Sequence, residues 1–267
     1  MVKSIDAAYG NAVADDYDAT YAGFDVSEAQ LALLAALAGD GHALEIGVGT
    51  GRVAIPLARK GVTVTGVDPS QTMLDILRSK DADCSVATRC GTLETMKGGS
   101  KFTLVYAPFN VLFMLSPDGA QTNFFADAAS VLLPGGHVVV ECFVPRPGTR
   151  LIDGANPAFF PAGRNIEVRS VTPDGISLLI SDNDQTRQVW QFNEVILRSD
   201  HTLHMVPSTI FYLEPEQIDA LAVRAGFKLV SRYSDWEGSA YTDESRKHVT
   251  VYAMSLDEGA APCQTTI

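Results

Sequence analysis

Apolar and polar positions alternate along the first half of this chain in blocks that have the lengths of strands and helices. Short apolar runs are typical of strands buried on both faces, and the segments between them repeat apolar residues at helical spacing. Strands that alternate with helices predict a parallel α/β sheet. The predicted strands are residues 43–46, 62–67, 84–87, 102–107 and 137–144; the predicted helices are residues 28–37, 52–60, a segment that begins at 70, and 123–133.

The alternation stops at residue 145, where short strands follow one another without helices between them. This pattern predicts an inserted antiparallel sheet. A helix is predicted to open at Glu214, with Pro215 in its first turn, and a closing antiparallel pair of strands to follow at 227–233 and 248–254. The strands of the insertion are predicted at residues 166–169, 176–180, 188–192 and 205–212.

The first predicted strand ends in three glycines at alternate positions, Gly47, Gly49 and Gly51. A strand, a glycine-rich turn and a helix form the first unit of a nucleotide-binding α/β sheet, because glycine lets the backbone approach a ligand closely. A dinucleotide fingerprint would place its third glycine at Arg52, and a phosphate loop would need Gly-Lys-Ser/Thr. Glu45 would repel phosphates and favours a cationic or amine-bearing ligand. A glycine-rich turn of some other α/β protein is the alternative.

The second predicted strand ends at Asp68, 21 residues after Gly47. In this kind of sheet a carboxylate at that place accepts hydrogen bonds from ribose hydroxyls. Together with the glycine turn, Asp68 therefore predicts an adenosine site.

Composition and charge narrow the class of protein. The 267 residues suffice for one large domain, or for one domain with an insertion, and 46% of them are hydrophobic. No segment is long enough to span a membrane and residues 1–10 lack a signal core, so we expect a cytoplasmic protein. The formal net charge of −12 argues against a nucleic acid partner. Neither the four cysteines nor His201 and His204 have a metal-binding pattern, so no metal is expected.

The acidic glycine turn, Asp68, the segment after the fourth strand and the Pro-Gly-Gly run at 134–136 occur in the same order as in a known family. In these features the chain resembles the class I S-adenosylmethionine-dependent methyltransferases. The resemblance implies a Rossmann-like α/β sheet of seven strands with the last strand antiparallel, and an inserted antiparallel β subdomain. It also implies S-adenosyl-L-methionine as cofactor, with S-adenosyl-L-homocysteine as product. A nicotinamide-dependent oxidoreductase and a catalytically silent binding module remain the alternatives from other classes.

Two positions depart from the family pattern. Related enzymes often carry an acid at the place of Thr92, where it bonds the adenine, and another at the place of Thr103. A hydroxyl at Thr92, or the backbone N–H of Leu93, is the replacement that this sequence offers.

The resemblance also implies a division of the chain. Residues 1–40 are expected to form an N-terminal helical lid, although Tyr17 and Tyr21 could equally pack on the main domain. Residues 41–145 and 214–255 would bind the cofactor, 146–213 would form the substrate cap or an oligomer contact, and 256–267 would be a mobile tail.

The acceptor is expected to be a small molecule. By resemblance to aminosugar and glycine-type N-methyltransferases, an amine nitrogen is the first choice, with a homodimer through the β insertion. An electron-rich carbon, as on an indole, and a hydroxyl remain open. Rich use of Ala, Gly and Asp is typical of a high-GC bacterium, and suggests a natural-product pathway.

The resemblance assigns site residues to three roles. The catalytic group comprises Tyr9, Tyr17 and Phe113. The cofactor-binding group comprises Tyr17, Tyr21, Glu45, Gly47, Gly49, Gly51, Arg52, Asp68, Pro69, Met73, Thr92, Leu93, Ala107, Pro108 and Asn110. The substrate-binding group comprises Tyr9, Phe113, Met114, Tyr212, Trp236 and Tyr241; for the last two, simple packing is the alternative.

Overall fold

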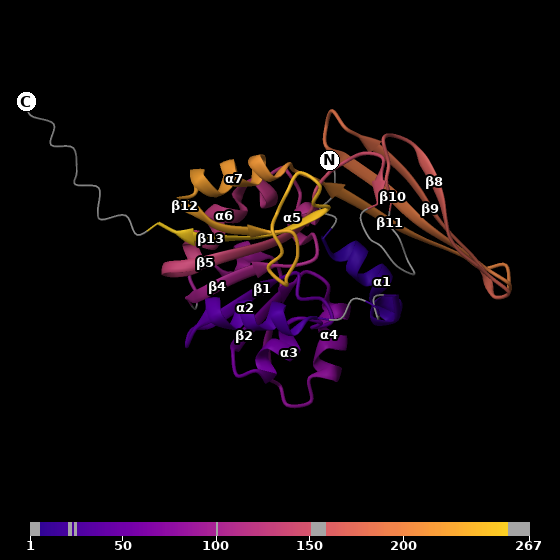
Figure 1. The fold of residues 1–267 in the computed structure, drawn as a ribbon. Helices are drawn as coiled ribbons and strands as arrows, with labels where there is room; N and C mark the ends of the chain where they lie inside the picture. The colour runs from indigo at the N-terminus through magenta and orange to yellow at the C-terminus, as the bar shows by residue number, and fades with distance from the viewer. Residues whose placement is uncertain (1–5, 21–22, 24–25, 100, 151–158, 256–267) are drawn as a thin grey trace, which may run out of the picture.

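A seven-stranded sheet forms the centre of the molecule in the computed structural model, which describes residues 6–20, 23, 26–99, 101–150 and 159–255 (Figure 1). The strand order is β12-β13-β5-β4-β1-β2-β3, and β13 runs antiparallel to β5 and β12. This confirms the predicted fold class. The strands are β1 (His42–Ile46), β2 (Thr63–Asp68), β3 (Val86–Cys90), β4 (Phe102–Ala107), β5 (Leu132–Phe143), β12 (Phe227–Tyr233) and β13 (Lys247–Met254).

Helices cover both faces of this sheet (Figure 1). One face packs on α2 (Glu28–Ala38), α3 (Ala54–Arg59) and α4 (Gln71–Lys80). The other packs on α5 (Val111–Met114), α6 (Ala120–Val131) and α7 (Pro215–Arg224), with the short helix η1 (Leu93–Met96) beside them. Each layer buries its own apolar cluster. No helix among the described residues is both long and apolar enough to cross a bilayer.

Local signals in the sequence set most of the helix ends. Ser27 and Ser70 cap α2 and α4 by accepting hydrogen bonds from backbone N–H groups of the first turn. Glu214 and Gln217 form a capping box at α7, with Pro215 in the first turn. The Pro-Gly-Gly run at 134–136, predicted as a break before the fifth strand, instead lies inside β5, because that strand already pairs with β4 at Leu132.

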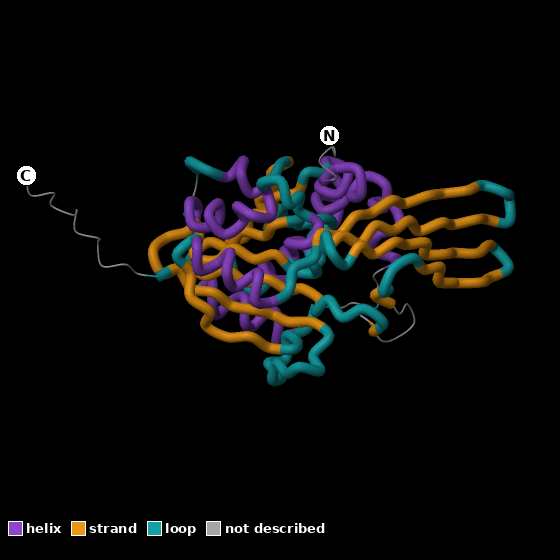
Figure 2. The backbone as a smooth tube through the Cα atoms, turned by 90° about the horizontal axis from the view of Figure 1, so that it is seen from above, coloured by secondary structure: helices purple, strands orange, loops and turns teal. Residues whose placement is uncertain are grey.

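A second sheet projects from one side of the α/β body (Figures 1 and 2). Its strands occur in the order β11-β10-β9-β8, and all neighbours are antiparallel. We call this four-stranded sheet the cap sheet; it matches the predicted insertion. Its strands are β8 (Asn165–Thr172), β9 (Gly175–Asp184), β10 (Val189–Arg198) and β11 (Leu203–Phe211), and the short pair β6 (Thr149–Arg150) and β7 (Phe159–Phe160) lies before it in the chain.

The N-terminal helix α1 (Asp6–Thr20) packs against both α4 and β11 (Figure 1). Its polar side chains tie it to the α/β body. Asp18 accepts hydrogen bonds from the Thr50 hydroxyl and the Lys80 ammonium, both at 2.6 Å. The Ser70 hydroxyl donates to Asn11 Oδ1, also at 2.6 Å. Helix α1 is therefore held by the glycine turn and by both ends of α4.

We predict that Gly66→Ala destabilises the fold. Gly66 lies within the buried strand β2, and an added Cβ would lie 2.5 Å from a methyl group of Val48. Forcing an extra methyl into a packed core costs about 1–3 kcal/mol. Urea denaturation should show this loss, whereas Gly163→Ala, where a Cβ meets nothing within 4 Å, should leave the midpoint unchanged.

Candidate functional site

A cavity of about 870 Å³ opens at the carboxyl ends of β1, β2 and β4. Its wall continues over α1, η1, α5 and α6 to one face of the cap sheet. Ligands of open α/β sheets bind at this edge. Twelve of the predicted cofactor residues line the cavity: Tyr17, Glu45, Gly47, Gly49, Arg52, Asp68, Pro69, Met73, Thr92, Leu93, Pro108 and Asn110.

The three glycines of the turn all have positive φ angles, of 67°, 52° and 81° in chain order. A Cβ on Gly47 would lie 2.8 Å from Val111, and one on Gly51 would lie 2.8 Å from Ile55. These two glycines permit close packing. A Cβ on Gly49 would meet no side chain within 4 Å, so the backbone there borders open cavity. Gly49 is thus the position where a ligand can approach the main chain.

Asp68 fixes the shape of this turn. Its Oδ2 atom accepts a hydrogen bond from Gly49 N at 2.9 Å, and its Oδ1 atom accepts one from Ser70 N at 2.8 Å. The side chain is largely buried, and burial raises its pKa although the two N–H groups act in the opposite direction. Each carboxylate oxygen can accept a second hydrogen bond, as a ribose hydroxyl would require.

Glu45 is a buried acid, with 2% of its surface exposed. The Tyr106 hydroxyl donates a hydrogen bond to Glu45 Oε2 at 2.8 Å. Burial nevertheless raises the pKa of Glu45 to about 8, with a further contribution from the charge of Asp68. A cation bound beside this carboxylate would supply the charge that its surroundings lack. Glu45 is therefore suited to an ammonium group.

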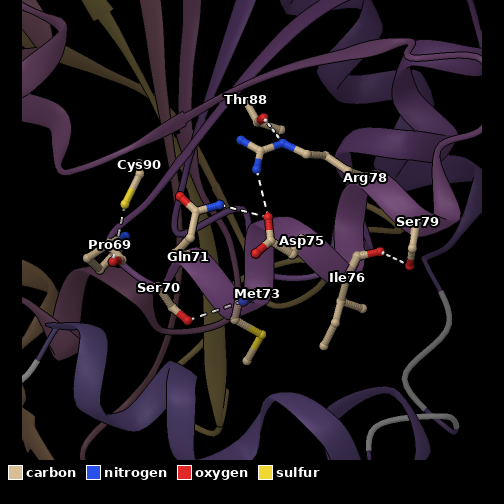
Figure 3. Close-up of polar contacts among 10 residues, drawn as sticks. All are labelled: Pro69, Ser70, Gln71, Met73, Asp75, Ile76, Arg78, Ser79, Thr88 and Cys90. Atoms are coloured by element: carbon tan, nitrogen blue, oxygen red, sulfur yellow. Dashed lines mark hydrogen bonds and ion pairs between the residues drawn. The ribbon is translucent and has the colours of Figure 1, made fainter.

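The start of α4 and the end of β3 form another part of the wall (Figure 3). The Ser70 hydroxyl accepts a hydrogen bond from Met73 N, and Cys90 Sγ donates to the Pro69 carbonyl at 3.5 Å. These contacts position Pro69 and Met73 beside Thr92 and Leu93, all four in the cavity wall. This apolar surface suits a flat ring such as adenine.

The loop after β4 is held by polar contacts with β5. Phe109 and Asn110 both have positive φ angles. Phe109 N donates to Glu141 Oε2 at 2.9 Å, and Asn110 Oδ1 accepts from Phe143 N at 2.7 Å. The Arg52 guanidinium lies 4.8 Å from the centre of the Phe109 ring. Asn110 thus shapes this loop as well as lining the cavity.

Some of the predicted catalytic and acceptor residues line the cavity, and others pack elsewhere. Tyr9, Tyr17 and Met114 line the cavity, Tyr9 and Tyr17 from α1 and Met114 from α5. Tyr21 lies outside the described residues. Two of the predicted cofactor-binding residues, Gly51 and Ala107, do not line the cavity and lie behind its wall, in the packed layer of the sheet.

Four residues predicted to contact the acceptor, with Phe113 predicted as a catalytic group as well, do not line the cavity, because their side chains pack elsewhere. Phe113 is fully buried edge-to-face against Phe143. The Tyr212 hydroxyl donates to Asn183 at 2.9 Å below the cap sheet. The other two also lie outside the cavity wall: Trp236 packs in the core of the opposite layer, and Tyr241 packs against His248 and Arg232.

Several cavity residues were missed by the sequence analysis. The inward positions of β10 contribute every second residue, from Trp190 to Arg198. Strand periodicity predicts such a set, but it does not say which face meets the cavity. Asp127, which forms an ion pair with Lys97 at 2.8 Å, comes from α6. Other missed wall residues are Glu94, Asp118, Asn123, Arg169, Phe192, Glu194 and Ser208.

Comparison with known proteins places this geometry in a family. A family described as a methyltransferase domain matches residues 43–136. The solved CcbJ methyltransferase from Streptomyces caelestis is 33% identical, with a TM-score of 0.80 over 93% of this chain and 99% of that one. An S-adenosylmethionine-dependent methyltransferase from Clostridium acetobutylicum shares the fold, with 11% identity and a TM-score of 0.73 over 90% of this chain and 98% of that one.

A curated relative is a ubiquinone biosynthesis O-methyltransferase from Bradyrhizobium. It is 32% identical over 146 residues, which are 52% of this chain and 56% of the relative. The chain thus spans about half the length of the curated relatives it matches.

This chain belongs to the class I S-adenosylmethionine-dependent methyltransferases. Its cofactor is S-adenosylmethionine, and the residues present fit that molecule. The open backbone at Gly49, the Asp68 carboxylate and the buried Glu45 match a nucleoside with a cationic amino acid tail. When bound, the cofactor supplies a methyl group activated on a sulfonium.

We predict that binding of the cofactor is coupled to the release of a proton from the Glu45 carboxyl group. The pKa of about 8 lies above the ordinary 4.5, so the unbound protein holds this proton below pH 8. A bound ammonium favours the carboxylate and expels the proton. Affinity for S-adenosylhomocysteine should therefore rise about tenfold per pH unit up to about pH 8 and then level off.

Calorimetry in two buffers of different ionisation enthalpy would detect this proton release directly. By the same linkage, Glu45 makes the unbound protein less stable as pH rises from 4.5 towards 8. Glu45→Gln should weaken binding and remove its pH dependence. An unchanged pH profile in that variant would refute the assignment of the proton.

Proposed function

We propose that this chain transfers the methyl group of S-adenosylmethionine to an amine nitrogen of a small molecule. The observation that carries the proposal is the continuous cavity, which joins the cofactor residues to α1 and to the cap sheet. Carboxylates line the cavity, among them Glu94, Asp118 and Glu194. With the net charge of −12, they favour the entry of an amine over that of an anion.

The reaction requires positioning more than acid–base chemistry. A deprotonated amine attacks the methyl carbon in line with the carbon–sulfur bond, so alignment and exclusion of water account for the rate. Tyr9 and Tyr17 are the groups that we assign to the methyl end of the cofactor. Their ring faces and hydroxyl oxygens can stabilise a sulfonium cation.

The division of the chain follows from the same proposal. Residues 1–40 act as the lid, and the bonds of Asp18 and Asn11 to the cofactor-binding elements support that role. Residues 41–145 and 214–255 bind the cofactor, and 146–213 cap the acceptor. The predicted mobile tail, 256–267, lies outside the described residues.

O-methylation is the second candidate, because the curated relatives are ubiquinone biosynthesis O-methyltransferases. A screen of small amines, indoles and phenols with isotopically labelled S-adenosylmethionine would decide between the acceptor atoms. Transfer to phenols alone would replace the amine proposal. Calorimetric titration with S-adenosylhomocysteine and with NAD tests the class itself, and binding of NAD alone would overturn it.

We predict that replacing both Tyr9 and Tyr17 by Phe lowers kcat about tenfold, because both hydroxyl oxygens are lost from the methyl site. Steady-state kinetics on an acceptor found in the screen would measure this. Tyr241→Phe is the matched control, since that tyrosine lies outside the cavity wall. Unchanged turnover in the double variant would contradict the assignment.

We also infer that two copies pair through the face of the cap sheet that points away from the cavity, here called the outer apolar face. Cross-strand pairing aligns its side chains in three rows of four. Asn193 is the one polar member of these rows, and the next row on the same side holds Gln191, Asp182 and Thr209. The rows are Ile166, Ile180, Asn193, Pro207; Val168, Leu178, Val195, Met205; and Val171, Ile176, Leu197, Leu203.

Exposure and charge support a second copy as the occupant. Val171 is 71% exposed, Ile166 67% and Met205 57%. Contiguous exposed apolar surface of this kind marks an interaction site. Because the chain is acidic overall, two copies repel each other over most of their surfaces. The three rows carry no charge, so they can meet the same rows of a second copy without that cost.

We predict that Val168→Glu with Met205→Lys makes the protein monomeric, because these charges would be buried between two sheets. Analytical ultracentrifugation should show a dimer for the unmodified chain and half that mass for the variant. Leu229→Lys, on the separate edge strand β12, is the control and should remain dimeric. A monomeric unmodified chain would exclude the interface.

A further inference from the structure

Glu194 lies in the middle of an apolar stretch of the cavity wall. On β10 its inward neighbours are Phe192 and Ile196, and across the sheet it pairs with Leu179 and Val206. All five residues line the cavity. A carboxylate in such a wall carries a desolvation cost unless a partner compensates it.

The Glu194 side chain is held in place but not neutralised. The Ser177 hydroxyl donates a hydrogen bond to its Oε1 atom at 2.9 Å, and Ser177 itself is buried. Two arginines of the cap sheet also line the cavity: Arg169 forms an ion pair with Glu167 at 3.4 Å, and Arg198 comes four residues further along β10. Within the described part of the chain, no ion pair involves Glu194. The carboxylate is therefore ready for a cation from a ligand.

Glu194 lies partway along β10, beyond the end of the strand that packs on the α/β body. Trp190, four residues earlier on the same strand, packs against Phe143 at the end of β5. Four residues of strand span about 13 Å. Along β10, Glu194 therefore lies about 13 Å from the contact of this strand with Phe143.

We propose that Glu194 binds a second, non-reacting cationic group of the acceptor. The inference rests on the proposed methyl transfer to a small amine, and it adds that the acceptor carries a protonated nitrogen at its far end. Phe192 then lies against the apolar body between the two nitrogens. The cavity of about 870 Å³ has room for a drug-sized acceptor beside the cofactor.

Two probes of equal shape test this site. One is 4,4′-bis(aminomethyl)biphenyl; the other is 4-aminomethyl-4′-ethylbiphenyl, which replaces one ammonium by a methyl. Calorimetry on the protein saturated with S-adenosylhomocysteine should give at least about tenfold tighter binding of the diamine. Glu194→Gln should abolish that preference, and Glu194→Asp should retain part of it.

Asp182→Asn is the matched control, because this exposed carboxylate is on the same sheet outside the cavity wall, and it should keep the full preference. The affinity for S-adenosylhomocysteine and the melting temperature of Glu194→Gln should equal those of the unmodified protein. Equal affinity for the two probes, no binding of either, or a preference that survives Glu194→Gln would overturn the proposal.

Labelled methyl transfer to the same two probes separates this inference from the proposed function. Methylation without a preference for the diamine would leave the function intact and refute the role of Glu194. A Glu194-dependent preference without methylation of any amine would support the site and count against amine methylation.

Discussion

The carboxylate of Asp68 is the contact on which the rest of the site depends. By accepting from Gly49 N and Ser70 N, it joins the glycine turn after β1 to the first turn of α4. Ser70 in turn links α4 to α1, because its hydroxyl donates a hydrogen bond to Asn11 and accepts one from Met73 N. One carboxylate thus orders three elements that are distant in the sequence. Loss of its geometry would disturb the cofactor contacts and the placement of the lid together.

The same region holds two buried acids, and this arrangement favours binding over stability. Glu45 and Asp68 lie near the ends of neighbouring strands, and the charge of Asp68 makes ionisation of Glu45 less favourable. A fold selected for stability alone would avoid such a pair. A ligand with an ammonium group and ribose hydroxyls compensates both acids, so the unfavourable interaction in the unbound state becomes affinity for the bound one.

The residues of the cofactor site could be predicted from the sequence, because local signals place them. The residues that line the acceptor site could not, because their positions depend on tertiary packing. The glycine spacing, Glu45 and Asp68 act within one strand–turn–helix unit and the adjoining strand, so their positions follow from the fold class. Trp236 and Tyr241 were assigned by their place in a loop, but which aromatic side chain enters a cavity depends on neighbours that the loop sequence does not specify. Phe113 was assigned to the cavity for the same reason. It belongs to α5, which does border the cavity, but its own side chain is fully buried in the core.

The cap sheet shows how narrowly register separates two roles. Its inner positions meet the acceptor cavity and its outer positions form the apolar face, and a slip of one residue would exchange them. The irregularity between Val168 and Ser170 bears on this separation, because it falls at Arg169. A bulge adds one unpaired residue, so the pairs beyond it are offset by one position along the bulged strand. Arg169 lies two positions after Glu167 on the cavity side, and the extra residue returns Val171 to the outer face that Val168 occupies. One extra residue in β8 thus keeps the row that contains Val171 on the side of the sheet that points away from the cavity.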